Sequence, residues 1–359
     1  MRVLYVRDAI TAHDRRFLKA IIEQGHQPVV ALISEGRLPD ALIDVGGVTL
    51  SVAPAALGSI AADYEVDVAH VGPVPTVAAV AAEHLPRHLP FVVVSWGCDV
   101  LRDCDDEQVR RRALLSLDRA SVVLVDCEAV PRKIRGWRPK FETPFVSFPW
   151  GVDLARYSGE RSPVSAALRD KLGWTANIVL ISTRSWEPIY GIDVLLAAFG
   201  RIVASNDAVR LLLIGDGSLR PTIMSQIDVL GLRERVHAPG RVPEKDLARW
   251  YAAADLYVSS SPCDGTSVSL LEAMASSLPA VVHGDLGNTE WIAERENGWL
   301  ADCRDPRSLA GALHEAIEKK AQWAAMGRTN RQRVVADADW AKNSPRLTEA
   351  YQLAKRRAA

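Results

Sequence analysis

The stretch NIVLIST, residues 177–183, decides the fold that this sequence predicts. It is a continuous apolar run rich in β-branched residues, as expected for a strand buried on both faces of a parallel sheet. Runs of the same kind occur before and after it, at 3–6, 29–33, 66–71, 91–95, 121–125, 210–215, 235–240, 254–260 and 279–284. Segments of helical character separate the runs, so the chain is predicted to be α/β, with parallel sheets covered by helices.

The alternation breaks once before it restarts at 177, in SFPWGVDLARYSGERSP, residues 147–163. Two prolines, two glycines and no periodicity are typical of a connection between domains. We therefore expect two Rossmann-like, doubly wound domains at 1–155 and 156–335, with a helical segment at 336–359 that packs back on the first. Facing sheets of this kind place a ligand cleft at the carboxyl ends of their strands.

The composition is that of a soluble globular protein. The 359 residues are 48% hydrophobic and 24% charged, and the net charge of -1 argues against a nucleic-acid partner. The five cysteines are odd in number and show no C-x-x-C spacing, so neither a disulfide framework nor a zinc site is indicated. No apolar run is long enough to span a bilayer, and no signal peptide opens the sequence. We expect a cytoplasmic protein that is at most peripheral to a membrane.

An acid occupies an apolar helix in CDGTSVSLLEAMASSLPAVVHG, residues 263–284. Glu272 has no basic residue within six positions on either side, and a dry, unpaired carboxylate is costly to bury. If it lies at the cleft wall, it is placed to accept hydrogen bonds from a vicinal diol such as ribose. The alternative is that Glu272 is a paired buried acid and Asp264 only a helix cap.

The turn before this helix has the features of an anion site. Gly265 permits a tight turn, and Thr266, Ser267 and Val268 would offer backbone N–H groups at the helix start. Arg184 directly follows the strand at 177–183, where its fork can reach phosphate oxygens in the cleft.

Four blocks together resemble glycosyltransferase family 4, whose members are retaining nucleotide-sugar enzymes of the GT-B fold. The blocks are DGTSVSLLEAMA, LLLIGDGSLRP, HAPGRVPEKDLARWYAAADLYVSSS and GNTEWIAERENGWL. The resemblance implies that Glu272 holds the ribose hydroxyls and that Asp264 contacts the donor sugar. It also implies that the N–H groups of 266–268 and Arg184 bind the diphosphate, while Arg241 and Val242 line the base pocket.

The sequence departs from the family pattern at three positions. Asp264 stands where the family usually has glutamate. Tyr190, an expected donor-binding residue, stands where the family has lysine. The diphosphate would therefore rely more on Arg184 and the helix end. Trp96 replaces the histidine of a His-Gly-x-Asp block. Asp99 is the aspartate of that block, and we expect it to have a polar, catalytic role. Trp96 either stacks on a sugar face or is simply buried, with Asp99 a helix cap.

Two weaker signals lie in the first domain. Asp8 and His13, on the loop after the first strand, are predicted to shape an acceptor pocket. Basic residues at 110–112 and between 132 and 140 form a patch that would suit an anionic lipid surface if the acceptor were lipid-linked. A solvated helix face is the commoner explanation of such a patch.

The resulting prediction is a retaining glycosyltransferase. It would move a hexose-type sugar from a UDP- or GDP-sugar to a glycan, a lipid-linked or a small-molecule acceptor. Arg184, Asp264 and Asp99 are the expected catalytic residues, and no metal and no cofactor are expected. Competing hypotheses are a GT-B epimerase or phosphorylase, and a non-catalytic nucleotide-sugar binder. The GDGSLR segment at 215–220 lacks the third glycine of a dinucleotide fingerprint and is expected to be a plain turn.

Overall fold

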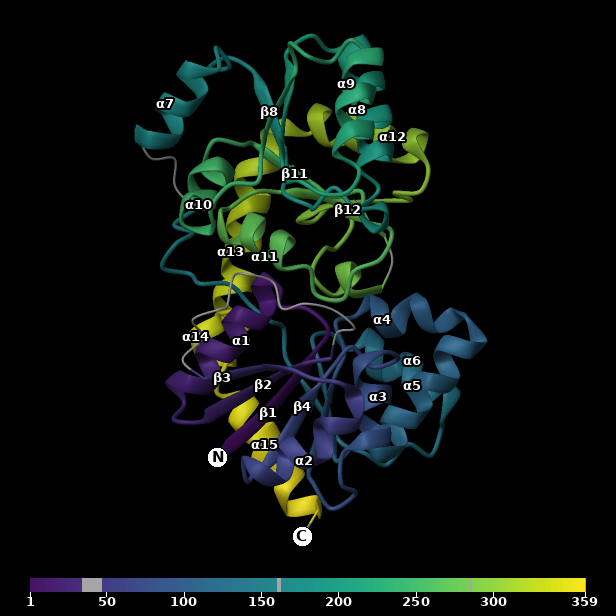
Figure 1. The fold of residues 1–359 in the computed structure, drawn as a ribbon. Coiled ribbons are helices and arrows are strands. Elements are labelled where there is room, and N and C mark those ends of the chain that lie inside the picture. Colours follow the sequence, from purple (N-terminus) through teal and green to yellow (C-terminus); the bar gives the residue numbers. More distant parts are fainter. Residues whose placement is uncertain (34–46, 160–162, 285, 359) are drawn as a thin grey trace. The chain divides into compact units, whose positions relative to one another are not determined.

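The computed structural model describes residues 1–33, 47–159, 163–284 and 286–358. The chain divides into two compact units (Figure 1). Unit 1 consists of Met1–Pro149 and Ala341–Ala359, and unit 2 of Trp150–Trp340. The chain therefore crosses between the units after Pro149 and after Trp340, each a few residues from the predicted crossing points at 155 and 335.

The described residues of unit 1 form a parallel sheet with the strand order β3-β2-β1-β4-β5-β6-β7. Its strands are β1 Arg2–Arg7, β2 Gln27–Leu32, β3 Val48–Ser51, β4 Val68–Val71, β5 Phe91–Val94, β6 Val122–Val125 and β7 Phe145–Ser147. The edge strands β3 and β7 were not predicted. Both are short and only partly buried, so they lack the apolar run that marks the central strands.

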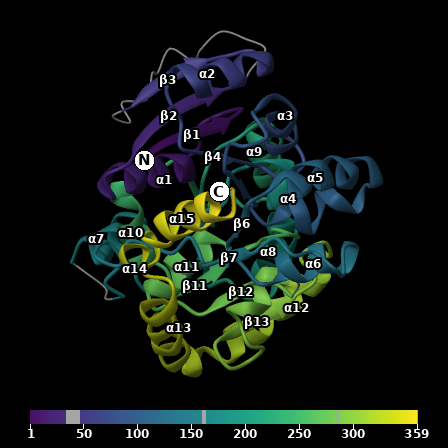
Figure 2. The same cartoon turned by 90° about the horizontal axis from the view of Figure 1, so that it is seen from below.

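Helices cover both faces of this sheet (Figures 1 and 2). They are α1 Ala12–Glu23, α2 Leu57–Asp63, α3 Val77–His84, α4 Cys98–Leu101, α5 Glu107–Arg119, α6 Ala129–Trp137, α14 Trp340–Asn343 and α15 Arg346–Ala358, with α14 starting at the last residue of unit 2. Phe17 of α1 and Tyr351 of α15 both contact the ring of His70 on β4, so these two helices share one face. The C-terminal helix thus completes the cover of unit 1.

The described residues of unit 2 form a second parallel sheet, with the order β10-β9-β8-β11-β12-β13. Its strands are β8 Ile178–Ser182, β9 Val209–Ile214, β10 Val236–Gly240, β11 Leu256–Val258, β12 Ala280–His283 and β13 Gly298–Ala301. The five strands predicted for this domain are present, and β13 is an additional edge strand. Each parallel pair brings the carboxyl ends of its strands to the same edge.

The helices of unit 2 lie on both sides of its sheet. They are α7 Pro163–Lys171, α8 Ile192–Ser205, α9 Arg220–Val229, α10 Glu244–Ala252, α11 Val268–Ala275, α12 Pro306–Glu318 and α13 Trp323–Asp337. Strand β8 supplies both cores because its side chains alternate between the faces. Ile178 and Leu180 join the core under α8, α9 and α12, whereas Val179 and Ile181 join the core under α10 and α11. The predicted pair of Rossmann-like domains is confirmed.

Candidate functional site

The candidate site lies at the carboxyl edge of the unit 2 sheet, where the loops after β8 and β11 meet. Arg184 stands two residues beyond β8, and the loop from 259 to 267 joins β11 to α11. These loops are neighbours because β8 and β11 are hydrogen-bonded to each other. Ser267 caps α11, accepting from the N–H of Leu270. Asp264 is therefore not the helix cap and has another partner.

That partner is Arg184. Its Nη2 donates to Oδ1 of Asp264 at 2.6 Å, and both side chains are about nine-tenths buried. Its Nη1 donates to the hydroxyls of Ser267 at 2.8 Å and Ser269 at 3.0 Å. Burial opposes the charged guanidinium, but the charges of Asp264, Tyr190 and Tyr257 and the hydrogen bond to Asp264 together raise the pKa of Arg184. Burial also opposes the charged form of Asp264 and raises its pKa, while Arg184 acts to lower it. The short contact between the two side chains identifies them as an ion pair.

Tyr190 packs on the same arginine. The Cζ atom of Arg184 lies 4.3 Å from the centroid of the Tyr190 ring, a cation-π contact. Tyr190 belongs to a short 3-10 helix, η3 Pro188–Tyr190, and its carbonyl accepts from Oγ of Ser260 at 3.0 Å. At the position where lysine was expected from the family pattern, this chain therefore supplies a ring that supports the arginine.

Glu272 is held by phenol groups. The hydroxyl of Tyr251 donates to a carboxylate oxygen of Glu272 at 3.0 Å, and it also contacts the hydroxyl of Thr183 at 2.6 Å. Burial, together with the charge of Glu272 and a hydrogen bond to it, raises the pKa of Tyr157. The acid that lacks a basic partner in sequence is thus stabilised by hydroxyl donors, which lowers the cost of its partial burial.

Ser269 connects the arginine and glutamate halves of the site. Its hydroxyl contacts Arg184 and the hydroxyl of Tyr257, the latter at 2.8 Å, while its carbonyl accepts from Tyr251 at 3.1 Å. Sequence reasoning missed this serine, as well as both tyrosines. The available signal was the position of Ser269 between Asp264 and Glu272, in a helix that is otherwise apolar up to Glu272.

The backbone around Asp264 is tightly packed. A Cβ added to Gly287 would lie 2.0 Å from the carbonyl oxygen of Gly265, and the N–H of Gly287 donates to the carbonyl of Asp264 at 3.3 Å. Thr266 and Ser267 are buried. Val268 and Ser269 occupy the first helical positions of α11, where backbone N–H groups have no acceptor within the helix. The predicted donors Thr266, Ser267 and Val268 lead into the start of α11, and their binding of an anion stays a prediction.

The GDGSLR segment supports the same loop. A Cβ at Gly215 would lie 2.3 Å from the carbonyl oxygen of Arg184, and one at Gly217 would lie 2.4 Å from that of Trp186. Helix α9 begins directly afterwards at Arg220, as expected for a turn followed by a helix. These glycines let the loop approach the backbone that carries Arg184.

The two residues predicted to line a base pocket follow β10. Arg241 is exposed, and Val242 is partly buried against the core beneath α10 and α11. Their role toward a base stays a prediction.

In unit 1, the carboxylate of Asp99 accepts hydrogen bonds from the loops around it, and the catalytic role expected of it stays a prediction. One carboxylate oxygen accepts from Oγ of Ser95 at 2.7 Å and the N–H of Trp96 at 2.9 Å, and the other accepts from the N–H of Val74 at 2.9 Å. Asp99 is 7% exposed, and burial raises its pKa against these hydrogen bonds. Its carboxylate holds the backbone of two loops, because buried N–H groups require acceptors.

Of the three residues predicted on the acceptor side, His13 and Trp96 contact each other and Asp8 does not join them. The rings of His13 and Trp96 lie 5.7 Å apart, and the guanidinium of Arg7 lies 5.0 Å from the Trp96 ring. Both rings are partly buried. Asp8 is exposed, and its carboxylate accepts from the N–H of Ala9. The structure thus joins His13 and Trp96 and gives Asp8 a local turn contact.

Part of the basic patch of unit 1 is paired with neighbouring acids. Lys133 pairs with Asp105, Arg111 with Glu107, and Arg138 with Asp118. These pairs are typical of a solvated helix face, and contact of the patch with a lipid surface stays a prediction. Within the described ranges, no helix is long and apolar enough to cross a bilayer. The same residues contain no cluster of three metal-ligating side chains.

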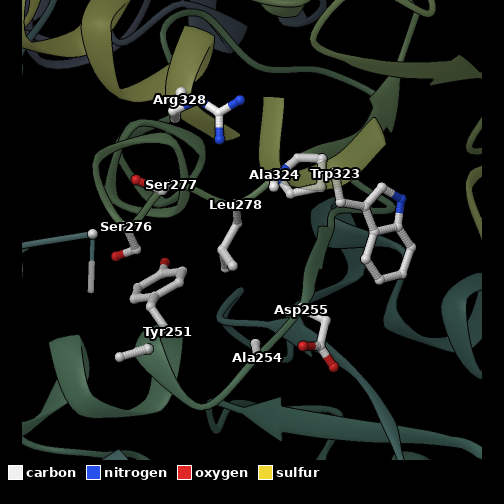
Figure 3. Close-up of a pocket in the computed structure, with 12 residues that line it drawn as sticks. Tyr251, Ala254, Asp255, Ser276, Ser277, Leu278, Trp323, Ala324 and Arg328 are labelled. Atoms are coloured by element: carbon white, nitrogen blue, oxygen red, sulfur yellow. The ribbon is translucent and has the colours of Figure 1, made fainter. Parts of the chain in front are cut away.

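A separate pocket opens at the opposite edge of the unit 2 sheet (Figure 3). Asp255 and Pro279, which precede β11 and β12, line it together with Trp323 and Arg328. Asp255 is engaged there in a two-point ion pair with Arg169. The pocket shares Tyr251 with the candidate site, whose hydroxyl is turned to Glu272.

Comparison with known sequences points to one family. Residues 176–319 match the family described as "Glycosyl transferases group 1". A "GDP-mannose-dependent monoacylated alpha-(1-6)-phosphatidylinositol monomannoside mannosyltransferase" from Corynebacterium glutamicum is 28% identical, over 60% of this chain and 57% of that protein. A "D-inositol 3-phosphate glycosyltransferase" from Thermobispora bispora is 30% identical, over 58% of this chain and 50% of that protein. The chain spans about half the length of these curated relatives.

Comparison with solved structures covers nearly the whole chain. HepE of Anabaena in complex with UDP-glucose has a TM-score of 0.80 at 20% identity, covering 98% of this chain and 99% of that one. Sucrose-phosphate synthase from Thermosynechococcus elongatus has a TM-score of 0.80 at 18% identity, covering 98% of both chains. The chain therefore has the GT-B fold, and its second unit matches the glycosyl transferases group 1 family over residues 176–319.

Proposed function

We propose that this protein is a retaining glycosyltransferase that takes a hexose-type sugar from a nucleoside diphosphate donor bound by unit 2. The observation that carries the proposal is the joined network at one sheet edge. There a buried arginine, a carboxylate at hydrogen-bonding distance from phenols, and a helix start are connected through Ser269. The arginine and the helix start suit the diphosphate of a nucleotide sugar, and the carboxylate suits its ribose hydroxyls.

The diphosphate is assigned to Arg184 and the start of α11. Transfer leaves negative charge on the departing nucleoside diphosphate, and fixed N–H donors, a helix dipole and a guanidinium stabilise such charge without a metal ion. Metal independence is thus part of the proposal, and EDTA should leave turnover intact. The relatives named above use GDP-mannose or occur in complex with UDP-glucose, so both nucleotides are candidates for this chain.

The ribose is assigned to Glu272. Tyr251 occupies one carboxylate oxygen, which fixes the orientation of the group in the absence of ligand. A diol would then donate to the carboxylate, and hydrogen bonds to a charged group contribute about 1.5–3 kcal/mol each. Asp264 would contact the transferred sugar after its hydrogen bond with Arg184 breaks or changes geometry.

The acceptor is assigned to unit 1, with His13 and Trp96 the side chains we place nearest to it. We propose a glycan, lipid-linked or small-molecule acceptor in the cytoplasm. If the acceptor is lipid-linked, the basic residues of unit 1 would provide peripheral contact with an anionic lipid surface.

The test measures nucleotide binding and donor turnover together. Thermal shifts and calorimetry with UDP, GDP, ADP and their sugars should identify one nucleotide that stabilises the protein, because a ligand of the native state raises its stability. Glu272→Ala should raise the Kd of that nucleotide at least a hundredfold, because two charge-assisted hydrogen bonds are lost. Exposed Glu296→Ala is the matched control.

The outcomes separate the candidate functions. Slow sugar release from the selected donor, lost in Glu272→Ala, would support the transferase. Tight binding with no turnover across a broad acceptor panel would support a non-catalytic nucleotide-sugar binder instead. Absence of binding by every nucleotide would contradict the donor-site assignment itself.

A further inference from the structure

We propose that Tyr190 is a positioning residue that sets how this site recognises a diphosphate. Its ring holds the guanidinium of Arg184 in place, and recognition then depends on short-range hydrogen bonding by a fixed arginine rather than on net positive charge. The inference rests on the donor assignment above and concerns the same site. It deepens that assignment by naming what replaces a second cation.

The backbone that carries the Tyr190 ring is held at the end of β11. Oγ of Ser260, two residues after β11, donates to the carbonyl of Tyr190 at 3.0 Å. Gly191 follows with a φ of +60°, and a Cβ there would lie 2.8 Å from the carbonyl oxygen of Ser260. The absence of a side chain at 191 therefore allows the loop to seat closely on the end of β11, which places the ring against Arg184.

The guanidinium of Arg184 is restrained at its N–H groups as well as on its planar face. Nη2 bonds Asp264, and Nη1 bonds Ser267 and Ser269, so the polar edge of the fork is fixed by three side chains. Tyr190 then contacts the flat face at 4.3 Å. A guanidinium held in this way loses little further conformational freedom when a ligand arrives, which favours binding by preorganisation.

The charge balance distinguishes this arrangement from a site with a free lysine. Arg184 and Asp264 together carry no net charge, and Tyr190, Ser267 and Ser269 are neutral. Glu272, at the ribose end of the same site, adds a negative charge. The site therefore supplies no net long-range attraction for a nucleoside diphosphate, and binding should depend little on ionic strength. A lysine at 190 would add an unpaired positive charge and make binding sensitive to salt.

The experiment uses Tyr190→Ala, Tyr190→Phe and Tyr190→Lys in the full-length protein. Ile189→Ala, which changes an exposed neighbour in the same 3-10 helix, is the control. Calorimetry gives the Kd of UDP and GDP at 25 and 500 mM NaCl, between which the Debye length falls from roughly 20 Å to about 4 Å. Circular dichroism and thermal unfolding establish that each variant is folded.

We expect the alanine variant to bind its nucleotide about three- to thirtyfold more weakly, the range of a cation-π contact converted to affinity, and phenylalanine to restore most of that loss. We expect the Kd of the unaltered protein to change less than threefold with salt. Tyr190→Lys should bind more tightly at 25 mM NaCl and lose that gain at 500 mM.

Two results would overturn the inference while leaving the donor assignment standing. One is a Kd for Tyr190→Ala equal to that of the phenylalanine variant. The other is a strong salt dependence, above tenfold, in the unaltered protein. A complete lack of nucleotide binding by the unaltered protein would overturn both the inference and the proposed function, so the two failures are distinguishable.

Discussion

The ion pair between Arg184 and Asp264 makes a prediction that links stability to ligand binding. Asp264→Ala removes the carboxylate but leaves the guanidinium buried, with its hydrogen bonds to Ser267 and Ser269. Removing one partner of a buried pair costs about 3–5 kcal/mol, because the remaining charge is uncompensated. The two serines keep part of the guanidinium satisfied, so we expect the lower end of that range.

The size of the effect is measurable by calorimetry. In a domain of the length of unit 2, 1 kcal/mol shifts the thermal midpoint by about 2–4 °C, so the unit 2 transition should fall by roughly 6–12 °C. Arg184→Leu in the same background removes the unpaired cation. The double variant should recover part of the lost stability, giving a coupling free energy of about 2 kcal/mol in a double-mutant cycle.

Measuring stability with a bound ligand tests whether the ion pair lies in an anion site. In Asp264→Ala, a bound nucleoside diphosphate would supply the missing negative charge, so it should stabilise this variant more than the unaltered protein. A ligand at a hundred times its Kd raises stability by about 2.7 kcal/mol, and a tighter complex adds to that. Additive effects of the two substitutions, together with equal ligand stabilisation of both proteins, would refute the reasoning.

Two further predictions concern buried hydroxyl and imidazole groups. Tyr251→Phe removes the hydroxyl that contacts Glu272 and Thr183, so unit 2 should lose about 1–2 kcal/mol in urea unfolding and the nucleotide Kd should rise severalfold; unchanged values for both would contradict the network. Burial and then the charge of Arg7 lower the pKa of His70 to about 3, so the folded state binds fewer protons than the unfolded state between that value and about 6.5. The stability this provides is complete above pH 6.5 and should be lost by about 1.4 kcal/mol per pH unit toward pH 4. His70→Asn should flatten this dependence, and an equal slope in both proteins would exclude His70 as its source.

The sequence by itself determined the α/β architecture, most of the strands and the position of the candidate site. Apolar runs such as 177–183 are visible because a strand buried on both faces must be apolar throughout its length. Arg184, Asp264 and Glu272 were found because each stands just after such a run or in the helix that follows it. The edge strands β3 and β7 escaped because burial of only part of a strand imposes no continuous apolar pattern. Strand β13 is mostly buried, but its sequence GWLA begins with glycine and contains no β-branched residue.

Only the tertiary structure decided which of these residues contact one another. Arg184 meets Asp264 across 80 positions of sequence, and Tyr251 meets Glu272 across 21. The first contact depends on the sheet order, which places β8 beside β11, and the second depends on α10 and α11 packing into the same core. Both arrangements are fixed by the packing of the whole unit rather than by any local pattern. For the same reason, only the structure shows that the carboxylate of Asp99 accepts hydrogen bonds from the Ser95 hydroxyl and from the N–H groups of Trp96 and Val74.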